Sequence, residues 1–134
     1  FGALRAIWGV AYGNNTFVAV GDDGKISTSP DGTTETWTAQ TSGTTKDFQG
    51  VAYGNNTFVA VGNDGKIFTS DNGTTWTSRT SGVAKRLNGV FFANSTFVAV
   101  GNQGTILTSP DGTTWTSRTS GTTNNLEDIS GPNE

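Results

Sequence analysis

The sequence contains no cysteine, no histidine and no methionine. This absence excludes disulfides, thiol chemistry, metal sites built on these ligands, and acid–base catalysis by histidine. Charged residues make up only 14% of the chain, and 11 acidic against 8 basic side chains give a net charge of -3. We therefore expect no nucleic-acid partner, because such partners require a basic surface. No apolar run approaches the roughly 18 residues that cross a bilayer, so we expect no membrane insertion either.

Chain length and small residues indicate one domain built from short strands. At 134 residues and 13.9 kDa the chain has the size of a single domain, which we take as residues 1–134. Its 19 glycines, together with many threonines, serines and asparagines, favour short strands and tight turns over helices. A polar surface without cysteine fits an exported protein that needs no disulfides, so we expect an extracellular or cell-surface location.

Three near-copies of one unit follow each other along the chain. The string GVAYGNNTFVAVG at Gly9–Gly21 returns at Gly50–Gly62, and the relaxed copy GVFFANSTFVAVG stands at Gly89–Gly101. Self-similarity at a period near forty residues is typical of propellers and other repeat proteins. We divide the chain into three units at about residues 5–41, 46–80 and 85–119.

Each unit reads as four short strands joined by turns. In the first unit we expect strands at residues 7–12, 16–20, 25–29 and 36–41, and the other units repeat them. The turns contain Asn-Gly or Asp-Gly pairs, which tolerate positive φ and are typical of hairpins. The Phe-Val-Ala-Val run of the second strand is apolar on both faces, although a strand with one wet face would alternate. We therefore predict an all-β fold of three four-stranded antiparallel blades, stacked face to face as in a β-propeller.

Three blades do not complete a propeller ring, which typically has four to eight. The apolar faces at the two ends would be bare, and bare apolar patches drive association. We therefore predict that another copy completes the ring, either as a homodimer that closes six blades or as an open head-to-tail array. Residues 125–130 match the first strand of a unit, so we expect a spare inner strand there. That strand fits the start of a fourth blade, the completion of a blade in another copy, or a cut from a longer propeller.

The turn between the third and fourth strands carries a recognisable motif. The segment Thr69–Trp76, TSDNGTTW, resembles the Asp-box or BNR repeat, with the pattern Ser/Thr-x-Asp-x-Gly-x-Thr-Trp. In the third unit the aspartate stands one residue later in the pattern, and in the first unit Glu35 and Thr36 are inserted before the tryptophan. The whole unit is similar to blades of photosystem II assembly/stability-factor type propellers. The resemblance implies an outer hairpin stabilised by aspartate, with the tryptophan packed between blades, at Asp31, Asp71, Asp111, Trp37, Trp76 and Trp115.

Asp-box propellers include sialidases, sorting receptors and assembly factors, so the resemblance does not by itself decide the function. A sialidase needs three arginines around a carboxylate, a Tyr–Glu nucleophile pair and an acid. Here Arg79 and Arg118 are expected on the outer strand, and the three glutamates lie in the insertion or near the end of the chain. We therefore predict that the protein is not an enzyme, with a fragment of a sialidase-like hydrolase as an alternative.

Acidic turns between the second and third strands do not predict a metal site. The sequences Asp22-Asp23-Gly24 and Asn63-Asp64-Gly65 offer one or two carboxylates per turn, whereas calcium takes six to eight oxygens. Aspartate and asparagine are also common in such turns because they accept left-handed backbone angles. We expect neither a metal nor a cofactor.

The positions at which the repeats disagree are the candidate ligand site. The second position of the first strand changes between units, while the glycine that follows it does not. Loops into this strand carry basic residues, and turns on the same propeller face carry Asp22, Asp23 and Asp64. Polar groups beside one aromatic ring are typical of sites for small polar ligands such as sugars, and a solvated face with salt bridges is the alternative. The predicted ligand-binding residues are Trp8, Gln49, Asn88, Arg5, Lys46 and Lys85.

Four functional hypotheses remain at this point. The first is a non-enzymatic extracellular module that self-assembles through blade-to-blade packing and acts as a structural or binding scaffold. The others are a lectin-like carbohydrate-binding propeller with glycan partners, a hydrolase fragment, and an assembly factor. Asn14, Asn55, Asn72 and Asn94 begin Asn-x-Ser/Thr sequons, which are either glycosylation acceptors or simply turn residues.

Overall fold

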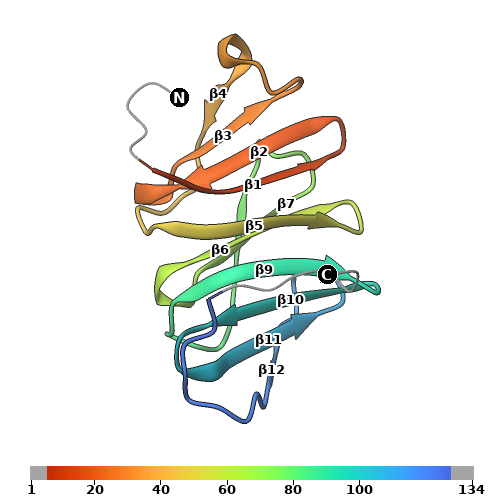
Figure 1. Ribbon diagram of the computed structural model, residues 1–134. Helices are drawn as coiled ribbons and strands as arrows, with labels where there is room; N and C mark the ends of the chain where they lie inside the picture. Colours follow the sequence, from red (N-terminus) through yellow and green to blue (C-terminus); the bar gives the residue numbers. More distant parts are fainter. Residues whose placement is uncertain (1–5, 128–134) are drawn as a thin grey trace.

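A computed structural model describes residues 6–127 as three stacked four-stranded sheets (Figure 1). Neighbouring strands are antiparallel and follow the chain order within each sheet, which confirms the predicted blades. Blade 1 comprises β1 (Ile7–Gly13), β2 (Thr16–Gly21), β3 (Ile26–Ser29) and β4 (Thr38–Gln40). Blade 2 comprises β5 (Phe48–Gly54), β6 (Thr57–Gly62), β7 (Ile67–Ser70) and β8 (Thr77–Arg79). Blade 3 comprises β9 (Leu87–Ala93), β10 (Thr96–Gly101), β11 (Thr105–Ser109) and β12 (Thr116–Arg118).

Short 3-10 turns connect the second and third strands of every blade. These turns are η1 (Asp22–Gly24), η3 (Asn63–Gly65) and η4 (Asn102–Gly104), and each holds one non-glycine residue near φ 60°. A further turn, η2 (Thr34–Thr36), contains the two residues inserted in the first unit. The outer strands are three residues long, whereas the sequence predicted six. The reason is that the residues before them are held in the β3–β4, β7–β8 and β11–β12 turns and do not pair.

A β-bulge interrupts the first strand of each blade at the same place. In blade 1, Ile7 pairs with Gly21 and Gly9 pairs with Val20, so Trp8 has no partner on β2. The register shifts in the same way around Gln49 and Asn88. A bulge leaves the extra residue outside the ladder and turns its side chain away from the sheet. Three polar or amphipathic side chains are thereby aimed at the edge where the strands begin.

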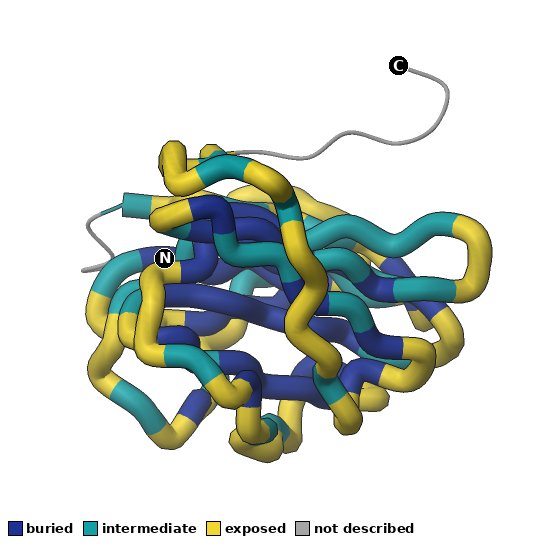
Figure 2. Tube along the Cα trace, turned by 90° about the horizontal axis from the view of Figure 1, so that it is seen from below, coloured by how far each residue is buried: buried dark blue, intermediate teal, exposed yellow. Residues whose placement is uncertain are grey.

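Two hydrophobic cores fill the joints between blades, because both faces of the second strand are apolar. We call the face that a blade turns toward the next blade its front face, and the opposite face its back face. Front-face Val18, Val20 and Ile26 pack against back-face residues of blade 2, among them Phe58 and Phe68. The second core repeats this arrangement between blades 2 and 3. Buried residues follow the strands in the middle of the stack and exposed residues follow the turns around it (Figure 2).

The two end faces of the stack differ from the internal joints. Val10 on the back face of blade 1 is 59% exposed, while the repeat-equivalent Val51 is 9% exposed. Ile7 and Tyr12 on the same strand are exposed as well. At the other end, the Leu126 backbone N–H donates to the Gly101 carbonyl at 3.0 Å, so the chain continues along blade 3. The predicted strand at 125–130 falls partly outside the described residues, since these stop at residue 127.

Candidate functional site

One side-chain pair recurs in all three blades at the edge where the first strands begin. Each bulge residue donates a hydrogen bond to the first residue of the 3-10 turn that lies fourteen positions later in the chain. The pairs are Trp8 Nε1 to Asp22 Oδ1 at 2.7 Å, Gln49 Nε2 to Asn63 Oδ1 at 3.1 Å, and Asn88 Nδ2 to Asn102 Oδ1 at 2.9 Å. We call the surface formed by these six residues the entry face.

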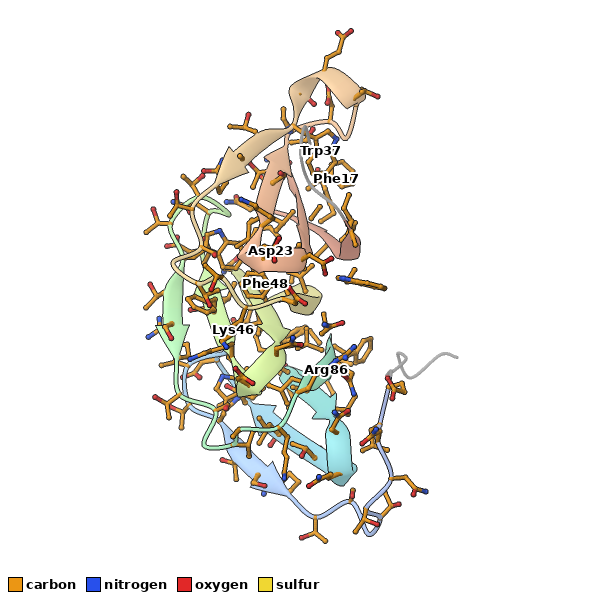
Figure 3. All side chains as sticks on the ribbon, turned by 90° about the vertical axis from the view of Figure 1, so that its left-hand side faces the viewer. Phe17, Asp23, Trp37, Lys46, Phe48 and Arg86 are labelled. Carbon is orange, nitrogen blue, oxygen red and sulfur yellow. The ribbon has the colours of Figure 1, made fainter. Side chains whose placement is uncertain are left out.

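Charged side chains surround the entry face on the linkers between blades. Arg86 Nη2 donates to Gln49 Oε1 at 3.1 Å and thereby joins the linker before blade 3 to the bulge of blade 2. Lys46 Nζ lies 2.9 Å from Asp64 Oδ2, with both side chains about half exposed. The hydrogen bond and the charge of Asp64 raise the pKa of Lys46, and those of Lys46 lower the pKa of Asp64. In Figure 3, Asp23, Lys46 and Arg86 follow one another from blade 1 to blade 3.

The segments that follow blades 1 and 3 also fasten the 3-10 turn of the preceding blade. The Asp23 backbone N–H donates to Asp47 Oδ1 at 2.7 Å, and the Gln103 N–H donates to Asn125 Oδ1 at 2.9 Å. Because the donors sit at the left-handed position of the turn, these bonds hold the turn in a conformation that non-glycine residues adopt infrequently. The entry face is therefore fixed by contacts between blades as well as within them.

Asn88 is the bulge residue with an unused polar atom. Its Nδ2 donates to Asn102 Oδ1 and to the Leu126 carbonyl, both at 2.9 Å. Its Oδ1 is buried and has no hydrogen-bond partner among the described residues. A buried carbonyl oxygen normally accepts a hydrogen bond, so Asn88 carries an unsatisfied acceptor beneath the entry face rather than on its open surface.

The structure brings together three of the six residues predicted to bind a ligand, Trp8, Gln49 and Asn88, in one repeated arrangement. Lys46 is engaged with Asp64, Lys85 is exposed on the linker before blade 3, and Arg5 lies outside the described residues. Sequence reasoning missed Asn63, Asn102, Arg86 and Asp47. The constant spacing of fourteen residues between a variable first-strand position and a polar turn residue is the signal that would have found two of them.

In the predicted Asp-box turns, side chains bind the backbone of the turn, and a buried serine lies at the centre of each. Ser29, Ser70 and Ser109 are at most 4% exposed. Each hydroxyl accepts the backbone N–H of the glycine three residues later, at 2.7 to 2.8 Å. Trp76 and Trp115 donate their indole N–H groups to the carbonyls of Gly73 and Gly112 at 2.8 and 2.7 Å. Both indoles lie half-buried against the cores between blades.

The assignment of Asp71 to this turn is wrong, because the acceptor in blade 2 is Asn72. Asn72 Oδ1 accepts the N–H groups of Thr74 and Thr75 at 2.8 and 3.0 Å, as Asp111 does for the two residues that follow Gly112. A side chain that bonds the backbone two residues on must stand directly before the glycine of this turn, and Asp71 stands one place too early. Asp71 is exposed and lines a shallow outer hollow with Arg79.

Acid should weaken the turns that contain an aspartate. The Thr36 hydroxyl, the Thr33 N–H and other donors lower the pKa of Asp31 to about 2, and the Thr114 and Thr113 N–H groups lower that of Asp111. A lowered folded-state pKa contributes stability above the ordinary value of 3.8, and this contribution is lost as pH falls toward 2. We expect D31N/D111N, which copies the neutral Asn72, to lose less stability than the unchanged chain between about pH 5 and about pH 2. Urea unfolding at both pH values measures this, and equal losses in the two proteins would contradict it.

Within residues 6–127, no group of three or more acidic side chains gathers in a way that would hold a metal ion. In the same part of the chain, no helix combines the length and apolar character that a bilayer crossing requires.

Comparison with known proteins places this geometry in a family. The family model described as DUF6242 beta propeller domain matches residues 2–117. No curated protein matches the chain. The solved structure of YCF48 bound to D1 peptide is similar, with a TM-score of 0.72 and 17% identity. The match covers 87% of this chain but 42% of that one, so this chain spans less than half the length of YCF48, and the likeness concerns fold alone. These findings confirm the predicted resemblance to propellers of the photosystem II assembly-factor type.

Proposed function

We propose that this chain, which belongs to the family of DUF6242 β-propeller domains, is a non-catalytic binding scaffold whose entry face binds a polar ligand. The observation that carries this proposal is the threefold bulge-to-turn pair, which holds an indole and two carboxamides in equivalent positions. A purely structural role would be served by the same residue in every blade. The repeats instead keep the geometry and change the side chain, which is typical of a surface that recognises different groups of one ligand.

An extended peptide with charges of both signs fits this surface best. Asp22, Asp23 and Asp47 lie at the junction of blades 1 and 2, whereas Lys85 and Arg86 lie on the linker before blade 3. The similar fold of YCF48 was solved with a bound peptide, which supports this ligand class.

A peptide array, followed by titration of the best sequence, tests the proposal. Trp8→Ala is expected to weaken binding at least about fivefold, because a partly exposed tryptophan is a frequent centre of binding energy. Asn55→Ala is the matched control, since the β5–β6 turn lies at the opposite end of the strand from the bulge. Binding that is equal in the Trp8→Ala variant and the unchanged chain would show that the entry face is not the site.

Carbohydrate binding is the second candidate, favoured by one observation. The Trp8 side chain is 56% exposed while its N–H is held by Asp22, so an oriented indole face is available for a sugar ring. A glycan array distinguishes the two candidates. A sugar bound by the unchanged chain and lost in Trp8→Ala, without any peptide binding, would favour the lectin-like function.

Assembly through blade-to-blade packing is the other part of the proposal. The exposed Ile7, Val10 and Tyr12 form an apolar strip on the back face of blade 1, and the equivalent residues of blades 2 and 3 are covered by the preceding blade. An apolar strip of this kind is stabilised when another sheet covers it. A second copy is one source of such a sheet, and the front face of its blade 3 is the surface that would have to fit.

A further inference from the structure

Each bulge-to-turn bond leaves one polar atom of the turn residue unused. The acceptor in every pair is an Oδ1 atom, so the second polar atom remains, which is Oδ2 in Asp22 and Nδ2 in Asn63 and Asn102. None of these three atoms has a hydrogen-bond partner among the described residues. In the same part of the chain, the buried side-chain atom without a partner is Asn88 Oδ1. The three turn atoms therefore reach solvent.

The unused atoms differ in hydrogen-bonding character from blade to blade. A carboxylate oxygen only accepts a hydrogen bond, and a carboxamide nitrogen only donates one. Asn63 and Asn102 cannot turn their carbonyl oxygens outward without losing the bond from the bulge residue. The entry face thus accepts at blade 1 and donates at blades 2 and 3. The bulge residues fix this order, because each one holds the Oδ1 atom of its turn residue.

Trp8 adds an aromatic surface beside the acceptor of blade 1. Its side chain is 56% exposed, and its Nε1 is held by Asp22 Oδ1 at 2.7 Å, so the carboxylate lies at the edge of the indole ring. A cation above an indole is attracted by the ring face, and a carboxylate at the ring edge can bond the same cation. The surrounding charge agrees, since Asp23 and Asp47 lie next to this turn and outnumber the exposed Lys25 that follows it.

The turn of blade 2 has the opposite preference. Gln49 donates from Nε2 to Asn63 Oδ1 and accepts from Arg86 Nη2 at its Oε1, both at 3.1 Å. Asn63 Nδ2 and the exposed guanidinium of Arg86 are thereby both held by Gln49, and each has only further donors to offer. A carboxylate or a peptide carbonyl fits such donors, whereas an amine or a guanidinium would leave them unpaired.

We propose that the entry face binds a peptide with a fixed order of groups, in which a lysine or arginine side chain lies on Trp8 and Asp22 and an oxygen acceptor lies at Asn63. These contacts belong to the ligand site of the proposed function, on which this inference rests. The turn residues, rather than Gln49, make the polar contacts with the peptide. A peptide bound in the reverse order would place a cation against donors and a carboxylate against Asp22, and both contacts are unfavourable.

Asp22→Asn separates the cation contact from the structure of the turn. Asparagine keeps an Oδ1 for the Trp8 indole N–H but removes the charge and turns a donor outward. The probes are the best peptide from the array and copies in which each lysine or arginine is replaced singly by norleucine, which has a straight, uncharged side chain. We expect the variant to bind the charged peptide at least about fivefold more weakly. The copy that lacks the cation of blade 1 should bind the variant and the unchanged chain equally.

Asp71→Asn is the matched control, because it makes the same charge change on the outer hollow and should leave the binding of every probe unchanged. Each comparison between peptides uses one protein variant, so a change in the stability of that variant does not affect it. Asn63→Asp reverses the polarity at blade 2 and keeps an Oδ1 for Gln49. We expect it to weaken binding of the same peptide at least about fivefold.

Several results would overturn the proposed order. They are a best peptide without lysine or arginine, and equal weakening of the charged peptide and all norleucine copies by Asp22→Asn. Unchanged binding by Asn63→Asp would overturn the place of the acceptor. If Trp8→Ala weakens binding while Asp22→Asn does not, the cation contact is wrong and the proposed function stands. If no peptide binds the unchanged chain, the proposed function as a peptide site fails together with this inference.

Discussion

Replacing Gly54 with alanine is expected to destabilise the folded chain by about 2–3 kcal/mol. The Phe92 ring covers Gly54, and a methyl group there would overlap it, so blade 3 would have to move away from blade 2. The sign of the effect is informative. Alanine in place of glycine at an extended, unobstructed position stabilises a protein by roughly 0.4–1 kcal/mol, because it restricts the unfolded chain. Urea unfolding followed by tryptophan fluorescence measures the change.

Ala93→Gly is the matched control for this substitution. Ala93 occupies the same repeat position as Gly54, but no further blade follows blade 3 among the described residues, so Ala93 has no equivalent of the Phe92 ring from a following blade. We expect a loss of at most about 1 kcal/mol, caused by the greater freedom of glycine in the unfolded chain. If Gly54→Ala unfolds at the same urea concentration as the unchanged chain, the Phe92 ring does not lie over Gly54.

The architecture could be predicted from the sequence because the repeated units show how many blades there are, and the pattern of apolar and polar residues along each strand shows which faces of a blade are covered. The second strand places Phe58 and Ala60 toward blade 1 and Val59 and Val61 toward blade 3, which is the two-sided burial that its apolar run indicated. Asn-Asn turns also matched their expected geometry, with Asn14 and Asn15 near φ 50° and 57°. These properties depend on single residues and their period, which a sequence displays directly.

Properties that depend on which two atoms meet were harder to predict. The motif pattern accepts Asp71, but only the backbone path shows that Asn72 reaches the N–H groups of the turn. The candidate site residues Trp8 and Gln49 were found because the repeats differ there. Their partners Asp22 and Asn63 follow at the same spacing of fourteen residues, but only the bulge in the first strand shows that the side chains meet. The sequence shows which way a side chain faces but not which atom it contacts. For this reason only part of the site could be predicted.

Phe58→Ala should cost about 3–5 kcal/mol of folding stability, the range found when a fully buried phenylalanine is truncated in a core. Phe58 is 0% exposed, and its ring centroid lies 4.5 Å from that of Tyr53 and 6.4 Å from that of Trp76. It faces blade 1 across the first core, so its removal leaves a cavity that two blades line. Thermal or urea unfolding of the full chain measures the loss.

Phe17→Ala isolates the contribution of the joint, because Phe17 holds the same repeat position and the same contact with a tyrosine. Its ring centroid lies 4.5 Å from that of Tyr12, as that of Phe58 lies 4.5 Å from that of Tyr53. The difference is that Phe17 is partly exposed on the back face of blade 1, with no blade before it among the described residues. We expect a loss of roughly 1–2 kcal/mol, since less apolar area returns to water and solvent fills the space. Equal losses for the two variants would mean that packing within a blade, rather than between blades, stabilises the chain, and the stacked sheets would then not depend on one another for their cores.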